Sequence, residues 1–173
     1  ENIYVKNIDM INIPTQTIGF NMFYEGASPV LEDGQKAEGN KAPEKVFAVT
    51  EETPIFRNIY FKNINAVNSY ESITINGLAE MNIKNIVIQD SQSDTQKNLP
   101  ILDTNRIILK NVKLKYIEGT GATIYNSKNI DLSTLQLESS QKPTIKVLGA
   151  KTTSVKLPKD VKGEQLQISK EIA

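Results

Sequence analysis

One short pattern of apolar and polar positions recurs along the chain. It consists of an Asn, an aliphatic residue and then alternating apolar and polar residues, often closed by a second Asn. It reads NIYVKNI over residues 2–8 and NIYFKNI over residues 58–64. Alternation with a period of two over such short runs indicates β-strands with one buried face. The chain is therefore predicted to consist of short strands.

The pattern returns at a nearly constant interval. After the copy at Asn58, further copies begin at Asn82, Asn105 and Asn129, and a degenerate copy begins at Thr153. The steps between them are 24, 23, 24 and 24 residues. Between these copies lies a second apolar strand, at residues 72–75, 99–102, 122–125 and 144–147. A fixed period of this size is typical of a solenoid in which each repeat stacks on the last.

Composition selects the kind of solenoid. Leucine-rich repeats need Leu at fixed positions, but the chain has 12 Leu against 22 Ile, and β-branched Ile favours strands. Propeller blades need about 40 residues per repeat. We therefore predict an all-β fold. It is a single-stranded solenoid, a right-handed parallel β-helix with about 24 residues per coil. Its hand follows from the strong right-handed preference of parallel crossover connections.

The 17 Asn residues invite two structural interpretations. Asn side chains of successive coils can stack and hydrogen-bond as a ladder at the bends. Alternatively, each Asn simply tolerates the left-handed backbone of a turn. Neither interpretation implies a functional role.

Residues 1–173 are expected to form one domain. Asn2 and Asn58 are 56 residues apart, more than twice one coil, so an extra segment must leave the solenoid. Residues 25–53, which are broken by Gly and Pro, are predicted to be this projecting loop. The polar residues 158–173 are predicted to be a C-terminal cap. Because the chain starts directly in a repeat, we expect it to be the C-terminal part of a longer solenoid.

Composition also excludes several classes of partner. The 20 basic and 20 acidic residues cancel, which argues against nucleic acid as a partner. No apolar run approaches the roughly 20 residues that span a membrane. There is no Cys for a disulfide or a thiolate metal site. Asp90 and Asp94 lack the dense oxygen spacing of a calcium loop, and Glu51-Glu52 is expected to be a solvated loop end, so no metal site is predicted.

Three strings resemble a known family. TQTIGFNMFY at residues 15–24, TPIFRNI at residues 53–59 and INGLAEMNI at residues 75–83 resemble the C-terminal coils of family 28 glycoside hydrolases, the polygalacturonase-like enzymes. The match is closest to the branch common in gut Bacteroides-type bacteria and covers roughly residues 1–135. In that family a Gly-Leu-Pro-Glu turn follows the coil, whereas here Ala79 replaces the proline.

The resemblance implies an exported, monomeric enzyme without a cofactor that hydrolyses galacturonan or rhamnogalacturonan in pectin with inversion. Such hydrolysis needs a carboxylic acid and a carboxylate with room for water between them. The family carries these groups in upstream motifs that this chain lacks: it has no His and no Asp-Asp pair, and Arg106 and Lys110 have the wrong spacing. Asn7-Ile8-Asp9 matches an Asn-x-Asp spelling but belongs to the repeat. No catalytic residue is predicted, and the chain alone is expected to be inactive.

One family feature has a candidate here, a tyrosine that lines the sugar-binding cleft. Tyr24, at the root of the loop, is the predicted substrate-binding residue, with Phe23 as a rim aromatic, because an aromatic ring can stack on a sugar. The alternative is that both rings cover the core where the loop leaves. The alternative function is a complete non-catalytic β-helix that binds carbohydrate or mediates adhesion.

Overall fold

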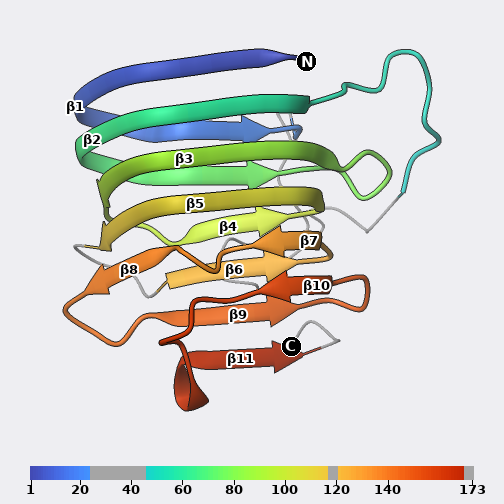
Figure 1. Cartoon of the computed structure of the whole chain (residues 1–173). Helices are drawn as coiled ribbons and strands as arrows, with labels where there is room; N and C mark the ends of the chain where they lie inside the picture. The colour runs from blue at the N-terminus through green and yellow to red at the C-terminus, as the bar shows by residue number, and fades with distance from the viewer. Residues whose placement is uncertain (24–45, 117–120, 170–173) are drawn as a thin grey trace.

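The computed structural model describes residues 1–23, 46–116 and 121–169. These residues form a parallel β-solenoid of about five turns with about 23 residues per turn, which confirms the predicted all-β parallel fold. Figure 1 shows the coils stacked in chain order, with the first strand at one end of the pile and the last strand at the other. The elements are β1 (Ile3–Asn21), β2 (Arg57–Asn76), β3 (Ile83–Thr95), β4 (Leu99–Leu102), β5 (Thr104–Tyr116), β6 (Gly121–Tyr125), β7 (Lys128–Asp131), β8 (Gln136–Ser139), β9 (Thr144–Leu148), β10 (Thr153–Lys156), the 3₁₀ turn η1 (Gly163–Gln165) and β11 (Leu166–Ser169).

All the strand pairs are parallel, as stacked coils require. One side of the solenoid follows the order β2, β3, β5, β7 and β10, and the other continues from the end of β2 through β4, β6, β9 and β11. The long strands β1 and β2 bend through both sides and pair with each other along their length (Figure 1). The predicted second strands at residues 99–102 and 144–147 lie within β4 and β9.

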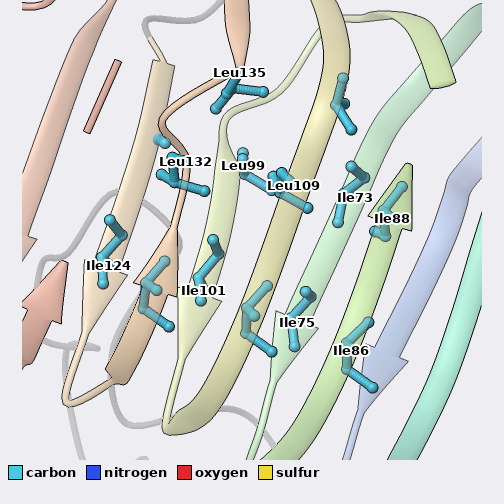
Figure 2. Close-up of a cluster of buried hydrophobic side chains, with 14 of the residues drawn as sticks. Ile73, Ile75, Ile86, Ile88, Leu99, Ile101, Leu109, Ile124, Leu132 and Leu135 are labelled. Atoms are coloured by element: carbon cyan, nitrogen blue, oxygen red, sulfur yellow. The ribbon is translucent and has the colours of Figure 1, made fainter. Parts of the chain in front are cut away.

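The core is a set of aliphatic columns that run along the solenoid axis. Ile59, Ile86, Ile107 and Ile130 occupy the same position in successive coils, and each is at most 3% exposed. Figure 2 shows the corresponding residues of both sides, such as Ile86 and Ile101, directed into the shared interior. Burying each such side chain contributes about 1.5–3 kcal/mol. This continuous column replaces the compact core of a globular domain.

The Asn residues at the bends satisfy both structural interpretations at once. Ten of the Asn residues have φ between 46° and 60°, in the left-handed region that Asn tolerates better than most residues. Their side chains also bond from coil to coil, as when Asn63 Nδ2 donates to Asn7 Oδ1 at 3.0 Å. Asn85 Nδ2 likewise donates to Asn58 Oδ1 at 2.8 Å. The bends are therefore held by both the backbone and the side chains.

The register predicted for the repeat was wrong in detail. The bend that begins at Asn58 continues, in steps of 27, 21, 23 and 25 residues, through Asn85, Arg106, Asn129 and Ser154. Asn82 instead lies in the turn before β3, where its Nδ2 donates to the carbonyl of Leu78 at 3.1 Å. Asn105 and Thr153 each precede the bend by one residue. Turns of unequal length produced a misleadingly even spacing of Asn in the sequence.

The structure describes part of the predicted loop and cap. Residues 25–45 lie outside the described residues, while residues 46–53 contain no strand, and Thr50 N–H donates to Thr53 Oγ1 at 2.9 Å. Within the region predicted as a cap, η1 is followed by β11, which pairs with β9. Leu166 packs against the core at this end.

Candidate functional site

The predicted substrate-binding residues lie at the edge of the described structure. Tyr24 is outside the described residues, so its role stays a prediction. Phe23 follows the end of β1, is partly buried, and its N–H donates to Asn21 Oδ1 at 3.0 Å. Its neighbour Met22 is 7% exposed and belongs to the core. Phe23 therefore lies next to the core at the root of the predicted loop.

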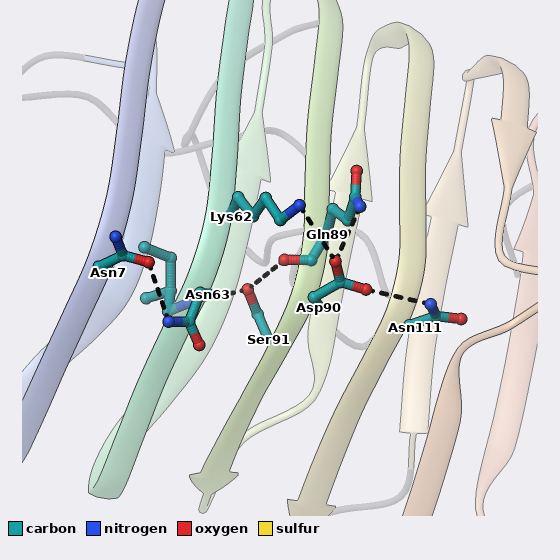
Figure 3. Close-up of polar contacts among 8 residues, drawn as sticks. Asn7, Lys62, Asn63, Gln89, Asp90, Ser91 and Asn111 are labelled. Atoms are coloured by element: carbon teal, nitrogen blue, oxygen red, sulfur yellow. Dashed lines mark hydrogen bonds and ion pairs between the residues drawn. The ribbon is translucent and has the colours of Figure 1, made fainter.

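A polar network surrounds Asp90, which lies at a bend within β3 (Figure 3). Its carboxylate accepts hydrogen bonds from Asn111 Nδ2 at 3.0 Å and Gln89 Nε2 at 2.8 Å, and Lys62 Nζ lies 3.7 Å away. The hydrogen bond from Asn111, followed by that from Gln89, lowers the pKa of Asp90 below its ordinary value. Asp90 has a φ of 51° and so takes the position that Asn holds in neighbouring coils. This carboxylate is part of the ladder that joins the coils.

Asp94 does not share this network, because it lies opposite Lys115 four residues further along β3. In the part of the chain that the structure describes, no group of three or more His, Cys, Asp or Glu side chains is placed to hold a metal ion. The Glu51-Glu52 pair is exposed in the turn before β2.

The Asn-x-Asp sequence at residues 7–9 contributes to the Asn ladders between coils. Asn7 accepts the hydrogen bond from Asn63, and Asp9 Oδ1 accepts one from Asn65 Nδ2 at 2.9 Å. The same spelling occurs at Asn129-Ile130-Asp131. The Asn and Asp side chains of both sequences lie at or beside the bends, on the outer side of their coils.

Asp131 is held by its own turn. It accepts a hydrogen bond from Ser133 Oγ at 2.6 Å and pairs with Lys156 Nζ at 3.3 Å. The hydrogen bond from Ser133 is the main cause that lowers the pKa of Asp131. A carboxylate kept ionised by a local turn resembles a structural group more than a general acid.

Two carboxylates are buried among the described residues, Glu71 at 8% and Asp103 at 6% exposure. The Oε2 atom of Glu71, on β2, accepts hydrogen bonds from Gln16 Nε2 at 2.6 Å and Thr74 Oγ1 at 3.0 Å. Both partners are neutral. Inverting hydrolysis needs two carboxyl groups with a water between them, so Glu71 with these partners forms no catalytic pair.

The most distinctive outer surface is a set of tyrosines and lysines that we name the Tyr–Lys face. Residues two apart on a strand point to the same side, so Tyr4 lies beside Lys6 on β1, and Tyr60 lies beside Lys62 on β2. The register then places Tyr4 on Tyr60 and Lys6 on Lys62, and the lysine row continues through Gln89 to Lys110. The Tyr–Lys face comprises Tyr4, Lys6, Tyr60, Lys62 and Lys110.

The two tyrosine rings are fixed against each other. Their centroids are 4.9 Å apart with an interplanar angle of 11°, and Asn85 Nδ2 donates to Tyr60 Oη at 3.0 Å. Tyr4 is nevertheless 67% exposed. A ring offers apolar surface and a hydroxyl, and lysine offers a positive charge. Together these groups can contact a sugar that carries a carboxylate.

Sequence reasoning missed the Tyr–Lys face although its signal was present. Both copies of the repeat, at residues 2–8 and 58–64, place a Tyr two positions before a Lys. Two equivalent copies of such a pair on a parallel solenoid must form stacked rows. Arg106, by contrast, lies at a bend with a φ of 65°, outside the row that contains Lys110.

The chain matches no known family model, no curated protein and no solved structure. The parallel β-helix is thus established by the structure, and the resemblance to polygalacturonases remains a prediction. Within the three described ranges, no helix has the length and apolar character to cross a membrane.

Proposed function

We propose that this chain is the C-terminal, substrate-contacting portion of a polygalacturonase-like glycoside hydrolase that acts on pectin. The intact parent would cleave galacturonan or rhamnogalacturonan with inversion. Two findings support the proposal: the parallel β-helix is the fold that the resemblance implies, and the Tyr–Lys face offers groups suited to an acidic sugar. The second finding carries most of the weight, because it concerns chemistry rather than fold.

The geometry of the Tyr–Lys face suits a polymer better than a single sugar. Strands in neighbouring coils lie about 4.8 Å apart, so equivalent side chains form rows along the solenoid. Lys6 and Lys62 stand in adjacent coils, while Lys110 lies two coils beyond Lys62 in the same row. A linear uronan carries a carboxylate on each sugar, and several weak contacts along such a row add together.

The chemistry itself must come from elsewhere in the parent. The family's catalytic motifs are missing from the sequence, so the chain is expected to bind pectin without cleaving it. Export of the parent follows from its substrate, since a large polysaccharide does not enter the cytoplasm. No cofactor is needed for this class of reaction.

Affinity electrophoresis in gels that contain polygalacturonate tests the proposal. The chain is expected to be retarded, and a Lys6→Gln/Lys62→Gln variant should lose most of the retardation. Lys128→Gln/Lys142→Gln is the matched control, because it removes the same charge from exposed positions outside the Tyr–Lys face. A neutral galactan gel controls for non-specific drag. Equal loss in both double variants, or no retardation of the wild type, would contradict the proposal.

A complete non-catalytic β-helix that binds carbohydrate is the second candidate. It is favoured by the Tyr–Lys face, whose stacked Tyr4 and Tyr60 rings are compatible with a sugar. The mass of the natural protein in cells, detected with an antibody against this chain, separates the two candidates. A mass near that of these 173 residues supports the binding protein, and about twice that mass supports the enzyme.

A further inference from the structure

Three side chains of different chemistry meet at a single oxygen atom. Glu71 Oε2 accepts one hydrogen bond from the hydroxyl of Thr74 at 3.0 Å and another from the primary amide of Gln16 at 2.6 Å. Glu71 and Thr74 are 8% and 4% exposed, and Gln16, an exposed residue of β1, reaches them with its amide. A hydroxyl and an amide from two successive coils are therefore both held on one carboxylate.

The two hydrogen bonds do not neutralise the carboxylate. Both donors are neutral, and among the described residues no Lys or Arg forms a salt bridge with Glu71. Burying an unpaired carboxylate is costly, so a purely structural position would be served better by a neutral side chain. Proton transfer, by contrast, requires a group such as a carboxylate beside the atoms that exchange the proton.

The backbone of β1 is irregular just before Gln16. From Ile13 to Gln16 the strand advances three residues, while β2 advances two from Ser69 to Glu71, so β1 carries one extra residue. A bulge of this kind changes the direction of the side chains that follow it. The irregularity places Gln16 opposite Glu71.

The side chain of Gln16 runs along β1 toward Gly19. Its Cβ, Cγ and Oε1 atoms lie 3.4, 3.6 and 3.7 Å from the position that a Cβ atom would take on Gly19. Gly19 lies opposite Thr74 in the register of β1 and β2. The Gln16 amide therefore extends toward the coil position that Thr74 occupies.

These groups are the parts of an acyl-transfer reaction. A hydroxyl is a weak nucleophile until a neighbouring base takes its proton. An amide is a poor electrophile, because its nitrogen leaves only after it has gained a proton. Glu71 Oε2 contacts both the hydroxyl that must lose a proton and the nitrogen that must gain one. Holding reacting groups together in this way removes much of the entropic part of the barrier.

We propose that Thr74 and Gln16 form an intramolecular ester cross-link, with Glu71 as the group that transfers the proton. Thr74 Oγ1 attacks Gln16 Cδ, while Glu71 Oε2 takes the hydroxyl proton and passes it to Gln16 Nε2. A C–O bond forms, the C–N bond breaks, and ammonia leaves. Glu71 returns to its starting state, and the balance needs no further reactant.

The cross-link joins two successive coils, because Gln16 lies on β1 and Thr74 on β2. A covalent bond between residues far apart in the sequence stabilises a fold by restricting the unfolded chain, as a disulfide does. The chain has no Cys, and an ester forms without oxidation. The inference concerns the stability of the solenoid and is independent of the proposed function.

Intact-mass measurement of the denatured chain tests the proposal, after the folded protein has been incubated until its mass is constant. The wild type is expected to weigh less than its sequence by one ammonia. Trypsin should then release one species in which residues 7–36 are joined to residues 63–84, the peptides that contain Gln16 and Thr74. Mild hydroxylamine should separate the two peptides, because it cleaves esters.

The variants remove one part of the reaction at a time. Thr74→Val removes the nucleophile and Glu71→Gln removes the base, so both should keep the full mass of their sequence. Thr74→Ser retains a hydroxyl and should still cross-link. The matched control is Thr123→Val, which should cross-link as the wild type does. Thr123 stands in the same column as Thr74, two coils further on, and is 1% exposed.

Circular dichroism shows which variants are folded, and only those are compared. A wild-type mass equal to that of the sequence would overturn the proposal. Loss of ammonia without the joined peptides would also overturn it, because it would place the reaction at Asn76-Gly77, where cyclisation of the Asn side chain releases ammonia too. Cross-linking that persists in folded Glu71→Gln would contradict the role given to Glu71.

Discussion

The first coil and the third coil have an inward isoleucine at the same position, but the two side chains differ in their exposure to solvent. Ile3 on β1 and Ile86 on β3 belong to one column, yet Ile86 is fully buried and Ile3 is 46% exposed. The comparison shows that a solenoid repeat acquires its stability from its neighbours as much as from its own sequence. The end coil has one such neighbour, and an interior coil has two.

The largest expected difference between the two coils is in the cost of removing this side chain. Ile86→Ala should destabilise the protein by about 2–5 kcal/mol, because it leaves a cavity between two coils. Ile3→Ala should cost less than about 1 kcal/mol, since part of the side chain is already in water. Urea unfolding followed by circular dichroism measures both. Equal costs would mean that β1 is covered in solution.

The bend at Asn63 offers a second comparison, between two substitutions of the same residue. Asn63→Ala should cost about 1–2 kcal/mol for forcing Ala into the left-handed backbone, with a further contribution from the lost bond to Asn7. Asn63→Gly should cost less, because Gly adopts this backbone freely. Unfolding midpoints of the two variants give the comparison. If Gly were as costly as Ala, the side-chain ladder alone would hold the bend.

Two tyrosines provide a smaller contrast. Tyr116 is 3% exposed, and its hydroxyl donates to the carbonyl of Gly121 at 2.6 Å, while burial raises the pKa of Tyr116. Tyr116→Phe should cost about 0.5–1.5 kcal/mol through the lost hydrogen bond. Tyr4→Phe, at the exposed end of the Tyr–Lys face, should change the unfolding midpoint very little. A large cost for Tyr4→Phe would reveal a partner for its hydroxyl in solution.

The smallest expected effect concerns acid. Because the pKa of Asp90 is lowered in the folded protein, mainly by Asn111, its contribution to stability is present above the unfolded pKa of about 3.9. That contribution is lost as the pH falls through the lower folded pKa. Asp90→Asn should therefore flatten the decline of the urea midpoint below about pH 4. An identical decline in the variant would assign the acid sensitivity to other carboxylates.

Much of the fold could be predicted from the sequence, since the repeated Asn and alternating aliphatic residues are direct consequences of coil geometry. The register could not, because Arg106, Asp90 and Ser154 occupy left-handed bends without the Asn that marks the others. The turn around Asn82 placed an Asn close to the expected position for a different reason, a bond to Leu78.

The candidate site was less predictable than the fold. Tyr4 and Tyr60 were visible as parts of a repeat, but their stacking depends on which residues lie opposite each other in successive coils. The same holds for the Glu71 network, whose partner Gln16 is 55 residues away in the sequence. Contacts between coils depend on the length of every intervening turn, which short-range patterns do not encode.

Residue-resolved hydrogen exchange tests the account most directly. If β1 pairs with β2 alone, alternate amides along Ile3–Asn21 should exchange quickly, because only every second one bonds to β2. In β3, between β2 and β5, nearly all amides should be protected. Uniform protection along β1 would contradict this pairing, since it would show that the side of β1 away from β2 is also hydrogen-bonded.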